Sequence, residues 1–399
     1  NNSLGRVQTP VLAAISRRYR ERENHISSDS WPIYISLQKD GILFKMRRTQ
    51  DLPDKESATM FFQDCKLAHQ AQITGISHSV KEILPPDLLD LTQLQKEANI
   101  RYGYTASEVY DIAQSLYEKK LISYPRTSSR YLTEDVFDSL SPIMARLLSW
   151  ELFPAAKGTG GIDISSLSRH VISAEKANVH HAIIITGIRP GNMSEKEMQV
   201  YRLVAGRMLE AFMAPCRIET TNVEAVCAAQ HFKVEQTRII EAGWHDVFMC
   251  SDMIPTSGYS VKELPKMEKG DTLNVCGCNM VHKKQLPVNP FTDAELVEYM
   301  EQNGLGTVSS RTNIIRTLVN RKYIRYSGKY IVPTPKGMFT YETIRGKKIA
   351  DTSLTADWEK QLAGLESGMI TGQDFLNRIR TLAKEMTDDI FNTYSTKEE

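Results

Sequence analysis

The chain has 399 residues, of which 49 are Lys or Arg and 48 are Asp or Glu, with 41% hydrophobic and 8% aromatic residues. This length and composition are typical of a globular protein with about two to four domains, and they argue against a collagen, a coiled coil or a long disordered chain. The 6 Cys are too few for a disulfide framework, and no apolar run reaches the roughly 18 residues of a membrane helix, so we expect a cytoplasmic protein without membrane contact.

The N-terminal part of the chain alternates between helical and extended patterns. Residues 3–24 have apolar side chains at helical spacing and an arginine-rich flank, which predicts a helix. Residues 31–48 alternate apolar and polar side chains around a Lys-Asp-Gly turn, which predicts a β-hairpin. A short helix is expected at 54–66, and a further strand at 70–83.

A proline pair after Leu84 marks a boundary, beyond which the pattern becomes mostly helical. Helices are expected at 92–100, after the capping box Thr105-Ala106-Ser107-Glu108, and at 194–212. Residues 121–125 follow the second of these helices as extended chain, because Pro125 disfavours a helical conformation of Tyr124. The Gly-Thr-Gly-Gly run at 158–161 is expected to be a loop without a phosphate-binding pattern.

A period of two returns between residues 217 and 287. Short strands are expected there at 221–225, 231–237, 260–264 and 272–275. The texture resembles that of residues 31–83. We therefore expect one β domain formed by both stretches and interrupted by the helical insert of roughly residues 85–213.

The C-terminal part opens with a second capping box at residues 292–295 and a helix to residue 302. A helix at 310–320 and a hairpin at 323–332 follow, and this order is typical of a winged helix-turn-helix. Between residues 303 and 348, ten basic residues stand against one acid, Glu342. Such a patch attracts polyanions, so the net charge of +1 is only weak evidence against a nucleic-acid partner.

Four segments in chain order carry recognisable motifs. They are SLGRVQTP at 3–10, LQKEAN at 94–99 with LISYPRTSSRYL at 121–132, HHAIIIT at 180–186, and PFTDAELVEYMEQNGLGTVSSRTNIIRTLVNRKYI at 290–324, the last followed by PTPKG at 333–337 and LTADWE at 354–359. Together they resemble the type IA DNA topoisomerases, and the topoisomerase III branch most closely. The similarity extends over nearly the whole chain.

The resemblance implies an α+β multidomain fold with a toroidal architecture. A helical base with a winged-helix-like part would comprise residues 1–24 and 289–399. A β arch would comprise residues 25–83 and 214–288, and the helical insert at 84–213 would carry the nucleophile and swing away to open a DNA gate.

The resemblance also assigns three residues to the chemistry. Tyr124 matches the family nucleophile, which attacks a DNA phosphodiester and holds the 5′ end covalently without ATP. A phenol with a pKa near about 10 is a poor nucleophile, so it needs cationic neighbours. Arg126 matches the residue that neutralises the scissile phosphate, for which a planar guanidinium is well suited. Of the adjacent His180 and His181, the register favours His181 as a phosphate contact.

Nine further residues are expected to bind single-stranded DNA. Hydroxyl, amide and guanidinium groups near the start of the chain match family positions that hold the strand upstream of the cleaved bond. The turn before the helix at 310–320 offers hydroxyls and backbone donors at a helix N-terminus, and arginines continue that face. The residues are Ser3, Arg6, Gln8, Thr307, Ser309, Ser310, Arg311, Arg316 and Arg321.

No metal site is expected within these 399 residues. Cys276, Cys278 and His282 have poor spacing for a tetrahedral site. In the family, Mg²⁺ is bound by an acidic Toprim domain that precedes SLGRVQTP, and no Asp-x-Asp substitute occurs here. We therefore expect a fragment that lacks its Toprim partner, that is monomeric, and that neither cleaves nor relaxes DNA appreciably alone.

Two other interpretations stay open. A non-catalytic winged-helix DNA-binding module would explain the basic patch but not the order of the motifs. A protein unrelated to nucleic acids would need several coincidences. Ser128 and Ile185 depart from the usual family residues, an Asp and a Pro, and this puts fine phosphate contacts in doubt.

Overall fold

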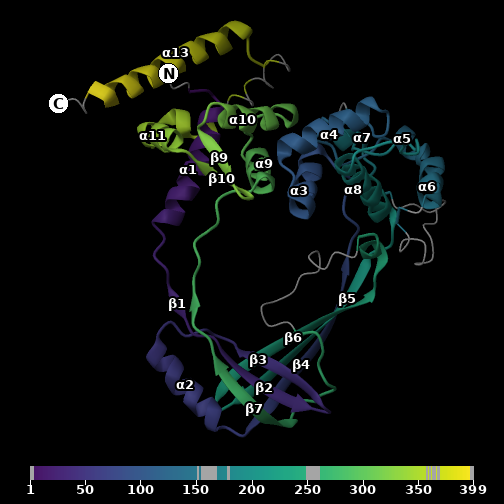
Figure 1. Cartoon of the computed structure of the whole chain (residues 1–399), viewed down its shortest axis with the longest axis vertical. Coiled ribbons are helices and arrows are strands. Elements are labelled where there is room, and N and C mark those ends of the chain that lie inside the picture. Colours follow the sequence, from purple (N-terminus) through teal and green to yellow (C-terminus); the bar gives the residue numbers. More distant parts are fainter. Residues whose placement is uncertain are drawn as a thin grey trace.

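The elements of the chain are arranged as a ring, with helices at one end and a β-barrel at the other (Figure 1). This computed structural model describes residues 4–150, 152–153, 169–177, 180–248, 261–355, 358, 361, 365 and 369–395. Two arms connect the ends. The thinner arm contains the pairing of β1 (Asp29–Ser30) with β8 (Lys283–Lys284), and the thicker one contains β4 (Gln70–Ile83) and β5 (Cys216–Cys227).

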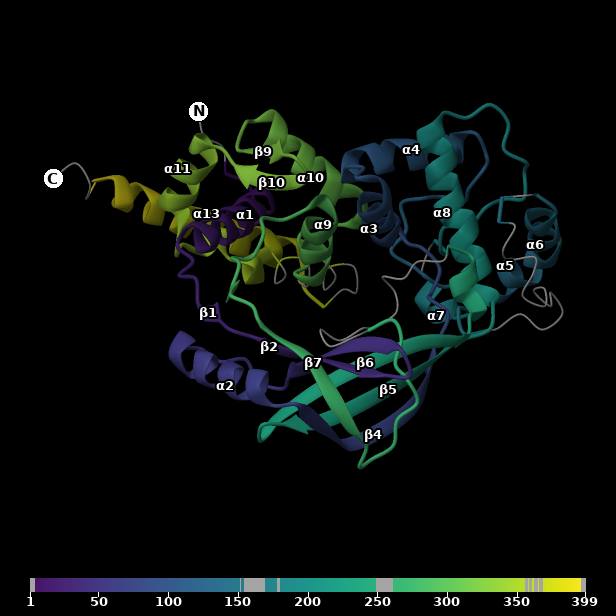
Figure 2. The same cartoon turned by 60° about the horizontal axis from the view of Figure 1, so that its bottom comes forward.

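The barrel is closed and antiparallel, with the strand order β2-β3-β6-β5-β4-β7 (Figure 2). The remaining strands are β2 (Ile33–Lys39), β3 (Ile42–Arg48), β6 (Gln230–Glu241) and β7 (Thr272–Met280). Alternate side chains of β2 are buried in its core, as the period of two predicts. Asp40 and Gly41 have φ values of 53° and 80°, the left-handed pair that joins β2 to β3 in a tight hairpin. Helix α2 (Lys55–Leu67) packs on the barrel through Cys65.

The long strands β4 and β5 connect the barrel to the helical insert. Their pairing continues to Ile83 opposite Cys216. There the indole of Trp244, in the short helix η3 (Gly243–Asp246), donates a hydrogen bond to the carbonyl of Ile83 at 2.9 Å. Cys216 and Trp244 belong to the buried cluster of the insert, so the thicker arm is anchored by apolar packing at its upper end.

The insert is built around α8 (Glu195–Phe212), which is buried along most of its length. Around it lie α3 (Leu91–Tyr102), α4 (Ala106–Glu118), α5 (Glu134–Asp138), α6 (Leu140–Ser149) and α7 (Ala174–Ala177). Arg207 of α8 is buried and pairs with Glu97 and Glu210, each at 2.8 Å. A buried guanidinium between two carboxylates satisfies charges that would be costly if left alone.

The base combines the two ends of the chain. It contains α1 (Gln8–Glu23), α9 (Asp293–Gln302), α10 (Val308–Asn320), the hairpin of β9 (Ile324–Ser327) and β10 (Tyr330–Pro333), α11 (Pro335–Ile344), η5 (Lys348–Ala350) and α13 (Gly372–Ser395). The buried face of α1 packs against the α9–β10 core. At Gly337 an added Cβ would lie 2.0 Å from the carbonyl oxygen of Tyr323, so the close approach of α11 to the residue before β9 requires a glycine.

The insert meets the base through polar contacts between α3 and α4 on one side and α9, α10 and β9 on the other. Asp293, which is 2% exposed, accepts hydrogen bonds from the backbone amide of Ala106 at 3.3 Å and from the hydroxyl of Tyr326 at 3.1 Å. Gln95 donates to Thr312 at 2.9 Å. The ring of the chain is therefore closed at its helical end by hydrogen bonds that side chains of one part make to backbone and hydroxyl groups of the other.

Most of the predicted elements are confirmed, including both expected capping boxes, the hairpins at both ends and the strand at 70–83. The strand expected at 260–264 is wrong for its described part, residues 261–264. Among residues 261–264, only Val261 makes a backbone hydrogen bond to β6, to the carbonyl of Glu235 at 2.8 Å, while the carbonyl of Lys262 accepts from the side chain of Gln236 at 2.9 Å. Pro265 has no amide hydrogen with which to extend a ladder. The expected loop at 158–161 lies outside the described residues. None of the described helices has the length and apolar character of a membrane span.

Replacement of Asp293 by Asn is expected to stabilise the fold in a pH-dependent way. Burial raises the pKa of Asp293 from 3.8 to about 6, so the folded chain binds this proton more tightly than the unfolded chain, and stability from this group is lost as pH rises through about 6. An Asn keeps the oxygen that accepts from Ala106 and Tyr326. We expect Asp293→Asn to add about 1–3 kcal/mol to the free energy of unfolding at pH 8 and less at pH 5.

Urea unfolding at the two pH values measures this difference. Asp388→Asn, at an exposed position of α13, is the control for the loss of one carboxylate and should change little at either pH. An equal gain for Asp293→Asn at pH 5 and pH 8 would contradict the assignment of the effect to the buried charge.

Candidate active site and nucleic-acid interface

Tyr124 lies in an extended segment that leaves the end of α4. The segment is fixed by a hydrogen bond from the amide of Ser123 to the carbonyl of Ile184 at 2.8 Å and by a bridge between Ile122 and Ile185. Pro125 follows Tyr124 and keeps it extended. Tyr124 is half-buried at the surface of the insert.

The ring of Tyr124 packs between two other rings. Tyr117 of α4 meets it edge-on with centroids 5.5 Å apart, and His180 lies 4.6 Å away. The ring contact with Tyr124 is made by His180, while Nδ1 of His181 lies 2.7 Å from the carbonyl of Ala182. The expectation that His181 contacts the phosphate stays a prediction.

Arg126 is held against the same helix. Its Nη2 donates to Oε1 of Gln114 at 3.1 Å, and its guanidinium carbon lies 5.1 Å from the ring centroid of Tyr110. Its Nε is buried without a hydrogen-bond partner among the described residues. Tyr124 and Arg126 thus share one support, the face of α4 formed by Tyr110, Gln114 and Tyr117.

This supporting face was not predicted from the sequence. Tyr117 continues the helical spacing of apolar residues, which favours burial, whereas the structure leaves its ring exposed. The spacing of residues 110, 114 and 117 puts them on one side of a helix, and this was the available signal. Nothing in the spacing says that the chain after residue 121 folds back onto that side.

At the start of α10, where an anion site is predicted, hydroxyl side chains form a cluster. The amide of Thr307 donates to Oγ of Ser310 at 2.8 Å, and the hydroxyls of Thr307 and Ser309 are 3.2 Å apart. Gly306 has a φ of 80°, and an added Cβ would lie 2.8 Å from Ser310. The tight turn therefore depends on this glycine. The N-terminus of the helix keeps donors for an anion.

Three more of the predicted residues gather near the start of α1. Nη1 of Arg321, at the end of α10, donates to Oε1 of Gln8 at 2.8 Å. Arg6 lies over the ring of Trp358 at 5.4 Å. Ser3 lies outside the described residues. Because Gln8 and Arg321 meet, the start of α1 and the end of α10 form one polar, basic surface.

Arg311 and Arg316 have structural partners. Arg311 is buried and donates to Thr92 at 3.0 Å and to Glu301 at 3.3 Å. Arg316 donates to Ser107 at 2.9 Å and to Asp111 at 2.8 Å. In this closed arrangement both side chains join the base to the insert, so their expected role in binding DNA stays a prediction.

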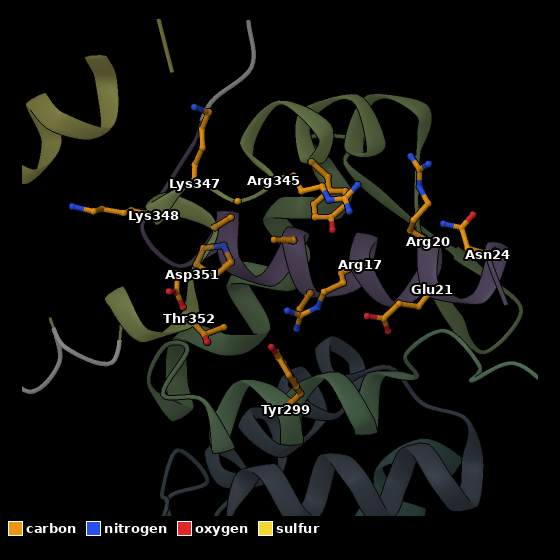
Figure 3. Close-up of a pocket in the computed structure, with 16 residues that line it drawn as sticks. Arg17, Arg20, Glu21, Asn24, Tyr299, Arg345, Lys347, Lys348, Asp351 and Thr352 are labelled. Atoms are coloured by element: carbon orange, nitrogen blue, oxygen red, sulfur yellow. The ribbon is translucent and has the colours of Figure 1, made fainter. Parts of the chain in front are cut away.

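A further basic cavity of about 910 Å³ lies in the base between α1, Tyr299 of α9 and the segment around η5 (Figure 3). Arg17 is exposed there and has no hydrogen-bond or ion-pair partner among the described residues. Lys347 and Lys348 instead bond Asp389 and Glu385 of α13. The combination of Arg17, Arg345 and Tyr299 suits a phosphate with an attached base, and none of the three was predicted as a site residue from the sequence.

The described residues contain no group of three or more His, Cys, Asp or Glu that could hold a metal ion. His282 stacks on Trp31 at 5.2 Å and bonds Asp29 at 2.9 Å. Cys276 is exposed on β7 and points to Gln38 and its own chain. The described residues therefore do not bring together the oxygen ligands that a Mg²⁺ ion requires.

The sequence profile of the family described as DNA topoisomerase matches residues 1–377. DNA topoisomerase 3 of Bacillus licheniformis is 30% identical over 413 residues, which cover 97% of this chain and 56% of the relative. DNA topoisomerase 1 of Methanocaldococcus jannaschii is 29% identical over 400 residues, with 100% of this chain and 50% of the relative covered. The chain therefore spans about half the length of the curated relatives it matches.

Full-length topoisomerase I from Thermotoga maritima has a similar structure, with a TM-score of 0.75 and 23% identity. The match covers 97% of this chain and 63% of that one. This likeness confirms the expected α+β toroidal fold, with its helical base, β arch and helical insert.

Replacement of Arg311 by Met is expected to destabilise the chain, because it leaves Glu301 and Thr92 without their buried donor. We expect the free energy of unfolding to fall by about 2–4 kcal/mol. Arg321→Met, at an exposed position at the opposite end of the same helix, should cost no more than about 1 kcal/mol. Urea unfolding of both variants at pH 7 measures the difference, and equal losses would show that the Arg311 contacts do not join base and insert.

Proposed function

The chain belongs to the type IA DNA topoisomerase family, and we propose that it forms the DNA-gate and single-strand-holding part of such an enzyme. The observation that carries this proposal is that Tyr124 and Arg126 both pack against one face of α4. That helix also meets the base through Ser107 and Asp111. A nucleophile, a phosphate ligand and a gate contact are thus supported by one element.

In the proposed reaction, the phenolic oxygen of Tyr124 attacks the phosphorus of one DNA strand. A bond from this oxygen to phosphorus forms, the bond from phosphorus to the 3′ oxygen breaks, and the phenolic proton passes to the leaving oxygen by way of solvent or a neighbouring base. The product is a 5′-phosphotyrosyl link and a free 3′-hydroxyl. Attack by that hydroxyl reverses the step, so no ATP is consumed.

The roles of the neighbouring groups follow from their chemistry. Arg126 stabilises the charge on the non-bridging phosphate oxygens, because its guanidinium stays charged and has donors left over. His181 stays the predicted phosphate contact. We propose His180 as a second one, because it packs on the Tyr124 ring and an imidazole N–H can donate to a phosphate oxygen.

We propose the boundaries 1–24, 25–83, 84–213, 214–288 and 289–399 for the segments of base, arch, insert, arch and base. Three separate buried clusters support this division. The insert cluster also includes Cys216, Trp244 and Val247, so the junction of the second arch segment belongs partly to the insert. A gate that opens between insert and base would break the polar contacts of Asp293, Arg311 and Arg316.

Single-stranded DNA is the proposed ligand of the base. The hydroxyl cluster at Thr307, the Gln8–Arg321 pair and the cavity beside Arg17 offer phosphate donors on three surfaces of the base. Single strands suit such sites because their bases can leave the stack and pack on aromatic rings. The alternative of a non-catalytic winged-helix module is not favoured, because the family match also includes the insert.

We further propose that Mg²⁺ acts in the whole enzyme through carboxylates supplied from outside these 399 residues, by a Toprim partner. The absence of a suitable donor cluster among the described residues supports this. When bound, the ion would stabilise charge at the reacting phosphate. A monomeric state and a cytoplasmic location remain predictions.

Tyr124→Phe tests the assignment of the nucleophile. In the longer polypeptide that supplies the metal-binding residues, the parent should yield a labelled covalent protein–DNA adduct on a denaturing gel with a 3′-labelled oligonucleotide. With a 5′-labelled one it should yield only a shorter free strand, because the protein is linked to the 5′ phosphate of the other fragment. The variant should lose the adduct completely and keep its DNA affinity, because only the attacking oxygen is removed. An adduct that persists in the variant would refute the role of Tyr124.

Fluorescence anisotropy of a labelled single-stranded oligonucleotide tests the proposed grip of this chain. Binding should favour the single strand over a duplex of the same sequence and should weaken as salt increases, because phosphate contacts release counterions. Gel filtration of the same sample checks that it is monomeric. A clear preference for duplex DNA, or no binding, would contradict the proposal that the base holds a single strand.

A further inference from the structure

The hydrogen bond that Arg126 donates to α4 differs from those of the neighbouring arginines, because its acceptor is a neutral amide. Arg130 pairs with Asp90 at 2.7 Å, and Arg316 pairs with Asp111 at 2.8 Å. Arg126 instead donates to Gln114 at 3.1 Å, and no ion pair joins it to a described carboxylate. Its positive charge is therefore not cancelled by a protein group in contact with it.

The orientation of the Gln114 amide is fixed by its second partner. Nε2 of Gln114 donates to Oε1 of Glu118 at 2.8 Å, one helical turn further along α4. A carboxylate only accepts hydrogen bonds and a guanidinium only donates them. One of the two amide orientations satisfies both neighbours, and the flipped one would face like groups on both sides. Glu118 thus directs the oxygen of Gln114 towards Arg126.

The guanidinium is held from a second side by Tyr110, whose ring centroid lies 5.1 Å away. With these two supports, Nε of Arg126 is still buried and lacks a partner among the described residues. A buried N–H without an acceptor costs free energy, and an incoming anion oxygen would remove that cost. The unfilled donor points to a ligand oxygen at this place, next to Tyr124.

We propose that Gln114 is a positioning residue, oriented by Glu118, that holds Arg126 for a DNA phosphate beside Tyr124 without neutralising its charge. The inference deepens the proposed function and rests on it. It explains why the position carries an amide, since Glu at the same place would fill the same space but would compete with the phosphate for Arg126. Leu would leave the charge free but the guanidinium unheld.

These alternatives are separated by single-strand binding measured over a range of salt concentrations. Gln114→Glu should weaken affinity by about tenfold and reduce the slope of log affinity against log salt by about 0.7, the value of one lost phosphate contact on a single strand. Gln114→Leu should weaken affinity by about threefold with the slope retained, because the charge remains. Gln63→Glu, on the exposed surface of α2, is the matched charge control and should change neither quantity.

For a further variant, non-specific electrostatic attraction and the proposed role of Glu118 predict opposite changes in DNA affinity. Glu118→Gln removes a negative charge, so non-specific attraction alone would tighten DNA binding. If Glu118 orients Gln114, the loss of that direction should instead weaken binding by about two- to threefold, with the slope retained. This exposed position at the end of α4 also serves as the test if Gln114→Glu does not fold.

The outcomes separate this inference from the proposed function. A parent chain that binds no single strand overturns both. A parent that binds, with Gln114→Glu equal to it in affinity and slope, overturns the inference alone. Thermal unfolding gives the remaining check, because a merely structural role would lower the melting temperature in step with affinity, and would leave the salt slope unchanged. Tighter binding by Glu118→Gln likewise overturns the inference.

Discussion

The carboxylate of Asp293 accepts a hydrogen bond from the first backbone amide of α4, and the placement of the reactive groups depends on that helix. Its N-terminal turn touches the base through Ser107, and its later turns carry Gln114 and Tyr117 against Arg126 and Tyr124. Ser107 and Gln114 are about 10 Å apart along the helix axis. A rigid helix of this length transmits the position of the base directly to the guanidinium and the phenol.

The contact between insert and base consists mainly of polar groups, whereas the core of a permanent interface is mainly apolar. Asp293 is buried and its pKa is raised by that burial, and Arg311 has a buried Nε with no partner among the described residues. Such groups offset part of the gain from closing, since each is better solvated when the surfaces part. The apolar clusters of insert and base are largely separate, although Ala106 of α4 packs into the base core. Opening between them would therefore expose little apolar surface and would cost mainly hydrogen bonds that water can replace.

Structural features that depend on a few neighbouring residues could be predicted from the sequence. Contacts between residues far apart in the chain could not. The capping boxes at Thr105 and Thr292 are local, because each cap satisfies donors within one turn. The contact between Asp293 and Ala106 joins residues 187 apart, and an acid in a first helical turn ordinarily indicates only a favourable helix dipole. Which of the rings of His180 and His181 packs on Tyr124 depends on the rotation of an extended segment, which motif register does not determine. The fold could be predicted because the family motifs span it, whereas the supporting face of α4 required coordinates.

The near-zero net charge of the chain does not indicate whether it can bind an anion, because this depends on the hydrogen-bond partner of each arginine. Arg207, Arg311 and Arg316 each pair with a carboxylate and hold elements together. Their positive charges are therefore largely neutralised within the molecule. Arg126 bonds an amide and keeps its full charge at the surface beside Tyr124. A count of basic residues treats these four alike, but only an uncancelled guanidinium can stabilise a phosphate strongly. The capacity to bind an anion therefore depends on which acceptor each arginine has found, and at Arg126 that acceptor is neutral.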